Sequence, residues 1–188
     1  MTASDPIRRV SSKLLRGAWR TGELACSAFR KARLRLMYPG FHADRATFIG
    51  PGCDIRVAPG GTLRLRACAV TRNVTITSGP GARMTIDAHY LGPSSVIVAR
   101  EHISIGAGTK IAENAVIRDA NHDHSVPLTR MRFTGAPVTI GADVWLGARS
   151  TVLAGVSIGD HCSIGAGAVV TRSVPAGSRA WGVPARVH

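Results

Sequence analysis

The segment Ile140–Val170 decides the fold of this chain, and it reads IGADVWLGARSTVLAGVSIGDHCSIGAGAVV. An aliphatic residue recurs in it at every sixth position, and a small or β-branched residue stands four places after each of the first five. Neither the helical period of about 3.6 nor the strand period of 2 predicts such a pattern. The aliphatic positions are Ile140, Leu146, Val152, Ile158, Ile164 and Val170.

A six-residue unit of this kind is a short strand followed by a turn, with the aliphatic side chain pointing inward. Three units close one triangular coil of about 18 residues, and stacked coils bury a continuous aliphatic column. Each buried Ile or Val contributes roughly 1.5–3 kcal/mol, so the column forms cooperatively rather than coil by coil. The narrow interior also explains why only 5% of the residues are aromatic. The sequence therefore predicts an all-β parallel β-helix.

The same register appears upstream at Ile105, Ile111 and Ile117, and more faintly at Ile49 and Ile55. It is degenerate between residues 41 and 95, and none is seen before residue 40. Inside the regular part it breaks once, because 23 positions separate Ile117 from Ile140 where six would continue the register. The extra residues form a polar excursion loop, 118–137, that carries two histidines. Loops of this kind on a rigid scaffold commonly carry function.

The chain of 188 residues has a formal net charge of +13, which favours binding to polyanions or to phosphate-bearing cofactors. Nucleic acid is not the expected partner, since interleaved aromatic residues and any known nucleic-acid module are absent from the sequence. No run of apolar residues approaches the length of about 18 that a membrane-spanning helix needs. The lack of a secretory signal pattern predicts a cytoplasmic protein.

More than half of the excess charge lies in residues 1–40, where nine basic residues oppose two acidic ones. This segment is predicted to be a basic amphipathic helix, or two helices broken near Gly22, preceding a β-helix domain at 41–188. Two roles stay open and are compatible: a cap over the open end of the β-helix, and peripheral contact with an anionic membrane. The apolar positions at helical spacing are Ile7, Val10, Leu14, Ala18, Ala25, Phe29 and Leu36.

The six-residue repeat resembles that of the hexapeptide-repeat acyltransferases. The segment Val144–Ala148 and the stretch 175–187 are most similar to the sugar and polysaccharide O-acetyltransferases of the galactoside and maltose acetyltransferase type. The resemblance implies a left-handed coil and a homotrimer with a groove between subunits. It also implies acetyl-CoA or another acyl-CoA as co-substrate, without a metal, and direct attack of a sugar or glycan hydroxyl on the thioester.

Acyl transfer to a hydroxyl needs a general base, and a neutral imidazole, with an ordinary pKa of about 6.5, suits that task. The family's histidine follows the aliphatic residue of the preceding unit by eleven positions, which from Ile111 leads to His122. Asn121 and His124 are the candidate acceptor-binding residues, and His124 is also an alternative base. Whether Asp119 or Asp123 orients the imidazole stays open.

The resemblance also implies a set of residues that bind acyl-CoA. Trp145 and Ala148 correspond to positions near the thioester, and Ala166 corresponds to one on the pantetheine arm. Three more residues correspond to positions near the nucleotide phosphates, where arginine forms bidentate, charge-assisted hydrogen bonds. They are Thr171, Arg172 and Arg186.

Two other functions remain as alternatives to an acyl-CoA-dependent O-acyltransferase. One is a non-enzymatic β-helix that binds a glycan or a protein partner. The other is a zinc enzyme of the γ-carbonic-anhydrase kind, which needs three histidine ligands, two of them five residues apart. No two histidines of this chain have that separation.

Overall fold

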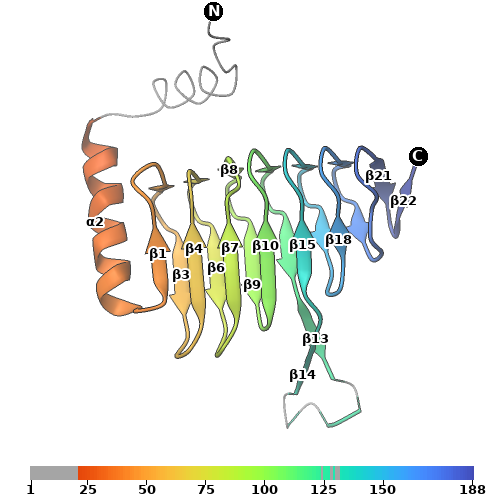
Figure 1. Cartoon of the computed structure of the whole chain (residues 1–188), viewed down its shortest axis with the longest axis horizontal. Coiled ribbons are helices and arrows are strands. Elements are labelled where there is room, and N and C mark those ends of the chain that lie inside the picture. Colours follow the sequence, from red (N-terminus) through yellow and green to blue (C-terminus); the bar gives the residue numbers. More distant parts are fainter. Residues whose placement is uncertain (1–20, 124, 128, 130–131) are drawn as a thin grey trace, which may run out of the picture.

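Three parallel β-sheets run along the molecule and form the faces of a three-sided rod, described over residues 21–123, 125–127, 129 and 132–188 (Figure 1). We name them sheets A, B and C in the order in which the chain visits them. Sheet A contains β1 (Phe41–Ala43), β4 (Thr62–Leu65), β7 (Arg83–Ile86), β10 (His102–Ile105), β15 (Val138–Ile140) and β18 (Ser157–Ile158). Sheet B contains β2 (Phe48–Ile49), β5 (Ala69–Val70), β8 (Tyr90–Leu91), β11 (Lys110–Ile111), β16 (Trp145–Leu146), β19 (Ser163–Ile164), β21 (Arg179–Gly182) and β22 (Ala185–Val187). Sheet C contains β3 (Asp54–Val57), β6 (Thr75–Ser78), β9 (Val96–Ala99), β12 (Val116–Arg118), β17 (Thr151–Val152) and β20 (Val169–Val170).

The interior of the rod consists of aliphatic columns, one beneath each sheet. Many strands are only two residues long, so each depends on its neighbours in the coils before and after it. The column beneath sheet B comprises Ile49, Val70, Leu91, Ile111, Leu146 and Ile164. The column beneath sheet C comprises Ile55, Ile76, Ile97, Ile117, Val152 and Val170.

The first three coils belong to the same rod although their repeat is degenerate in the sequence. Their extra residues all lie where the chain passes from sheet C to sheet A, which we call the C–A corner. Ten residues separate Ile55 from the inward Leu65 of the next coil, where the regular repeat has six. The inward positions still stack, so longer corner turns hide the register from a sequence scan without breaking the column.

The excursion leaves the rod at this C–A corner, between β12 and β15. The loop predicted over residues 118–137 contains a two-stranded antiparallel arm, formed by β13 (Ala120–His122) and β14 (Phe133–Gly135). Figure 1 shows the arm projecting away from the rod at this corner. His124 of the prediction lies outside the described residues.

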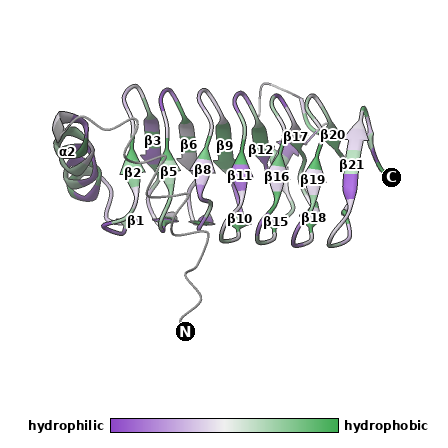
Figure 2. Ribbon diagram, turned by 90° about the horizontal axis from the view of Figure 1, so that it is seen from above, coloured by the Kyte–Doolittle hydropathy of each residue, from purple (hydrophilic) through white to green (hydrophobic). Residues whose placement is uncertain are grey.

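Helix α2 (Thr21–Met37) lies across the end of the rod that begins with β1 and β2 (Figure 2). The predicted apolar positions before residue 21 lie outside the described residues. Within the described ranges, no helix is long and apolar enough to cross a membrane.

The basic side chains of α2 bind the first coil. Arg30 donates a hydrogen bond of 3.0 Å to the carbonyl of Ile49, and Lys31 donates one of 2.7 Å to the carbonyl of Thr47. Arg35 binds a third carbonyl of the same coil. Burial lowers the pKa of Lys31, and the nearby Arg35 lowers it further. These bonds supply donors to carbonyls that have no preceding coil to pair with, so α2 caps the solenoid.

We expect Ser27→Ala to destabilise this cap. The Ser27 side chain is 2% exposed, and its oxygen accepts the backbone N–H of Ile49 at 2.9 Å. Alanine leaves that buried N–H without a partner, which costs about 1–3 kcal/mol of unfolding free energy, measured by urea denaturation. Ser157→Ala on the exposed face of sheet A is the control, with an expected change below about 0.5 kcal/mol. Equal effects of the two substitutions would contradict the role of Ser27.

Candidate functional site

A buried carboxylate holds the root of the arm. Asp119 is fully buried, and its two oxygens accept the backbone N–H groups of Arg100 at 2.7 Å and Glu101 at 2.8 Å. Its own carbonyl accepts the N–H of Ala136 at 2.8 Å, on the returning side of the arm. Asp119 therefore ties both ends of the arm to the turn between β9 and β10.

Three residues beyond this root, the arm displays the imidazole of His122. The backbone of His122 pairs with Phe133 across the arm, and the two rings lie 4.6 Å apart between centroids. The guanidinium carbon of Arg100 lies 4.2 Å from the centroid of the Phe133 ring, in a cation–π contact. His122 is thus supported on one side by a ring that the rod itself holds, while its side chain remains exposed.

Asn121 and Asp123 flank His122 in the sequence, and each has its own contacts within the arm. Asn121 is exposed and pairs with Thr134 across the arm. One oxygen of Asp123 accepts the N–H of Ser125 at 2.9 Å, and the other lies 3.8 Å from Arg132. Both contacts are local to the arm. Of the two carboxylates considered for orienting the imidazole, Asp119 instead binds backbone amides of the rod.

A second group of predicted residues gathers at the corner between sheets B and C, the B–C corner. Trp145 faces outward from sheet B and is 47% exposed, and Ala148 follows it in the turn. Ala166 occupies the same turn one coil later, where the N–H of Gly167 donates to the carbonyl of Ala148 at 2.8 Å. In the described part of the chain, the N–H groups of Ala148 and Ala166 donate to no protein acceptor. They are available to solvent or to a ligand.

The C-terminal strands extend this second group. Trp181 lies directly beside Gly165, since a Cβ added to that glycine would come within 2.8 Å of the Trp181 Cβ. Trp181 pairs with Arg186 across the β21–β22 hairpin, and its ring stacks on His188 at 3.9 Å. Arg186 therefore belongs with the B–C corner.

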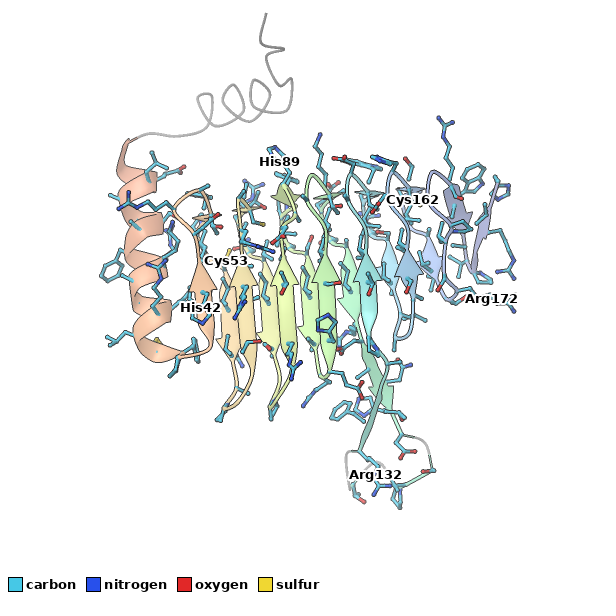
Figure 3. All side chains as sticks on the ribbon, in the orientation of Figure 1. His42, Cys53, His89, Arg132, Cys162 and Arg172 are labelled. Atoms are coloured by element: carbon cyan, nitrogen blue, oxygen red, sulfur yellow. The ribbon has the colours of Figure 1, made fainter. Side chains whose placement is uncertain are left out.

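Thr171 and Arg172 do not join that group. They follow β20, so they lie at the C–A corner, on the side of the rod from which the arm leaves. Figure 3 shows Arg172 near the C-terminal end of the rod and Arg132 on the arm. Within one chain, sheet C separates the predicted nucleotide residues Thr171 and Arg172 from the predicted pantetheine residue Ala166.

The outer face of sheet C, between these two corners, carries a row of short apolar or β-branched side chains from β6 onward. This row consists of Thr75, Val96, Val116, Thr151 and Val169, all half-buried. Charged residues on the same face are Asp54 and Arg56 in the first coil and Arg118 at the end of β12. The equivalent row on sheet A contains His42 and Arg64, and that on sheet B contains Lys110 and Trp145. From β6 onward, this row of sheet C thus contains only valine and threonine, whereas the equivalent rows of the other two sheets contain charged or aromatic residues.

Comparisons with known proteins agree with this architecture. The family described as "Bacterial transferase hexapeptide (six repeats)" matches residues 137–172. The chain is 30% identical to "Putative colanic acid biosynthesis acetyltransferase WcaF" of Escherichia coli K12, over 66% of this chain and 70% of that protein. The chain belongs to the hexapeptide-repeat acyltransferase family. It is also 31% identical to galactoside O-acetyltransferase of Escherichia coli K12, over 57% of this chain and 54% of that protein.

Two solved structures share the fold. A maltose O-acetyltransferase from Clostridium difficile 630 is 26% identical, with a TM-score of 0.58 over 96% of this chain and 84% of its own. PerB from Caulobacter crescentus, in complex with CoA and GDP-perosamine, is 25% identical, with a TM-score of 0.56 over 76% of this chain and 56% of its own. The predicted left-handed parallel β-helix preceded by a helical segment is confirmed. The chain spans about half the length of the first curated relatives that it matches.

The zinc-enzyme alternative requires a cluster of metal ligands. Among the residues that the structure describes, no three His, Cys, Asp or Glu side chains come together in a way that could hold a metal ion. Across the arm, the described neighbour of the His122 ring is the phenylalanine ring of Phe133.

Sequence reasoning missed Arg100 and Phe133 as supports of His122. Phe133 is the only Phe, Tyr or Trp in the excursion, which could have marked it as a structural anchor for the arm. Arg100 gave no such signal, because its contact with Phe133 depends on how one coil stacks on the next.

We expect Asp119→Asn to loosen the arm at its root. Asparagine retains one carbonyl oxygen but places an NH₂ group against the second backbone N–H, so one buried donor loses its acceptor. The expected cost is about 1–3 kcal/mol of unfolding free energy, with faster hydrogen exchange at the Arg100 and Glu101 amides. Asp87→Asn is the control, because Asp87 pairs with the exposed Arg66. Unchanged amide exchange in D119N would contradict the anchoring role.

Proposed function

We propose that the protein is an acyl-CoA-dependent O-acyltransferase that transfers an acetyl group to a hydroxyl of a sugar or glycan. The observation that carries this proposal is the imidazole of His122, exposed on an arm whose root is fixed to a hexapeptide-repeat rod. The name of the galactoside O-acetyltransferase relative supports transfer to a sugar hydroxyl, and the CoA and sugar nucleotide in the PerB complex support acyl transfer to a sugar in general. Because acyl-CoA is held inside the cell, we assign the reaction to the cytoplasm.

In the proposed mechanism, His122 acts as general base. Its neutral imidazole accepts the proton of the acceptor hydroxyl while the hydroxyl oxygen attacks the thioester carbonyl carbon. The backbone N–H of Ala148 stabilises the tetrahedral oxyanion. The C–S bond then breaks, and the departing CoA sulfur takes the proton from the imidazolium. The products are the O-acyl sugar and CoA, and His122 is neutral again.

The acyl-CoA groove of this proposal lies between two chains of a homotrimer. Three copies could pack around a threefold axis that runs alongside the outer face of sheet C. This packing would bury the Val- and Thr-rich row of that face. This arrangement brings the B–C corner of one chain against the C–A corner of the next. Trp145 and Ala166 of one copy would then share a groove with His122 and Arg172 of its neighbour. The separation of these residues within one chain supports a site built from two.

The acceptor would enter from the side of the arm. Asn121 is exposed next to His122 and presents an amide that can bind sugar hydroxyls. Arg172 and Arg186, at the two corners that meet, are assigned to the CoA phosphates together with Thr171. His124 remains a proposed acceptor-binding residue.

We expect His122→Ala to lower kcat/KM by about 10²–10⁴, because the acceptor hydroxyl loses its base. The measurement is release of CoA from acetyl-CoA in the presence of candidate glycans, with mass spectrometry of the products. His42→Ala, an exposed histidine on the first coil, is the matched control and should leave the rate unchanged. Equal rates for H122A and wild type would refute the mechanism. Failure of the wild type to bind CoA in calorimetry would instead favour a glycan-binding protein without enzymatic activity.

A shared groove also predicts complementation between two inactive variants. His122→Ala removes the arm's base, and Ala166→Arg fills the opposite side of the groove. When the two differently tagged chains are co-expressed in equal amounts and mixed trimers are purified, one of the three grooves in each mixed trimer, about a third of all grooves, contains neither substitution. Activity should therefore return to about a third of the wild-type value. Trimers that stay inactive would place the site within one chain, and a monomeric wild type would exclude this groove.

A further inference from the structure

The outer face of α2 is an apolar stripe that points away from the rod. Ala25, Phe29, Ala32 and Leu36 recur at the spacing that places residues on one side of a helix. Phe29 is 71% exposed and Leu36 is 88% exposed, the latter being the highest exposure among the large apolar residues described. We call this set the outer stripe. An exposed apolar patch of this kind indicates a site that binds an apolar surface, such as another protein or a membrane.

The opposite face of the helix accounts for this orientation. Ser27, Arg30 and Lys31 face the first coil and bond to its backbone, and Leu34 and Tyr38 contact the core beside them. The open end of the rod demands hydrogen-bond donors for its carbonyls, so the basic residues turn inward. The apolar residues on the far side of the helix are consequently displayed to the outside.

The surroundings of the outer stripe are cationic. Arg33 is exposed beside Phe29, and the only acidic residue of the helix is Glu23, in its first turn. A cavity of about 180 Å³ between α2 and the first coil is lined by Arg30 and Arg33 but also by Asp54. Arg33 is therefore the cation that lies closest in sequence to Phe29 on the exposed side. In sequence, residues 1–20 add five basic residues against one acidic residue. Apolar surface bordered by cations matches an anionic lipid surface.

We propose that the outer stripe of α2 docks the protein on an anionic membrane surface. Phe29 and Leu36 would insert among the lipid acyl chains, while Arg33 and the neighbouring basic groups bind phosphate headgroups. Figures 1 and 2 show the helix axis perpendicular to the axis of the rod, so this whole end can lie flat on a lipid plane. The arm leaves the rod four coils away and remains clear of the membrane. The inference is independent of the proposed acyl transfer, and the proposed trimer would present three such stripes on one end.

The test is co-sedimentation of the full chain with vesicles. One set contains phosphatidylcholine with phosphatidylglycerol at about 30%, and the other contains phosphatidylcholine alone. Binding is expected to the anionic vesicles, weakening as salt rises because the headgroup contacts are screened. The double variant Phe29→Ser, Leu36→Ser should lose about tenfold in binding, and Arg33→Gln should lose several-fold.

The matched control is Leu24→Ser on the same helix. Leu24 is 54% exposed but lies to the side of the outer stripe, so its replacement should leave binding within about twofold of the wild type. Circular dichroism and the unfolding midpoint should be unchanged in all of these variants, because none of the replaced side chains is buried.

Each other outcome decides against the proposal. Binding that is lost on deletion of residues 1–20 but unaffected in F29S/L36S would assign the contact to the preceding segment. Wild-type assemblies larger than a trimer that F29S/L36S dissociates would assign the stripe to a second copy of the chain. Equal binding to neutral vesicles would exclude anionic headgroups, and absence of binding to either vesicle would refute membrane docking. Acetyltransferase activity is not a readout here, so the two proposals fail separately.

Discussion

The stacking of aliphatic side chains into continuous columns is the constraint on which the molecule depends. Strands of two residues, such as β16 (Trp145–Leu146), have too few hydrogen bonds of their own to be stable. Leu146 stays in place because Ile111 lies beneath it and Ile164 above it in the same column. The backbone ladder and the columns therefore form together. A surplus of residues is tolerated only at a corner, where it does not displace an inward side chain.

Every large departure from the regular repeat occurs at the C–A corner. The lengthened turns after β3, β6 and β9 lie there, and so does the arm that carries His122. An arm inserted at a corner is attached only through its root, so its direction requires a separate anchor. Asp119 supplies it by binding two backbone N–H groups of the preceding turn, and Arg100 adds a contact with Phe133. The position of the imidazole is thus set by the rod although His122 itself is exposed.

The two ends of the rod are closed in different ways. At the C-terminal end, the chain folds back as β21 and β22, with Trp181 stacked on His188. At the other end, the carbonyls of the first coil take hydrogen bonds from basic side chains of α2. At this N-terminal end, the basic side of the amphipathic helix α2 contacts the rod, and its apolar side therefore faces outward. One structural requirement, the supply of donors to an open coil, thereby creates the surface that we assign to lipid.

The sequence by itself determined the three-sided rod and the place of the excursion, because these depend on residue type and spacing within one or two turns. The choice of His122 as the proposed base rests in addition on the resemblance to the family. The period of six encodes which side chains face inward, and it does so locally. Only the tertiary structure decided that Asp119 binds the amides of Arg100 and Glu101, and that Ala166 and Arg172 lie on opposite corners. Those relations join residues from different coils or opposite edges of a sheet, and the number of residues in each corner turn decides how they align. The orientation of α2 was also decided only by the tertiary structure. Its amphipathic pattern is clear in the sequence, but its basic side faces the rod because the carbonyls of the first coil accept hydrogen bonds from it.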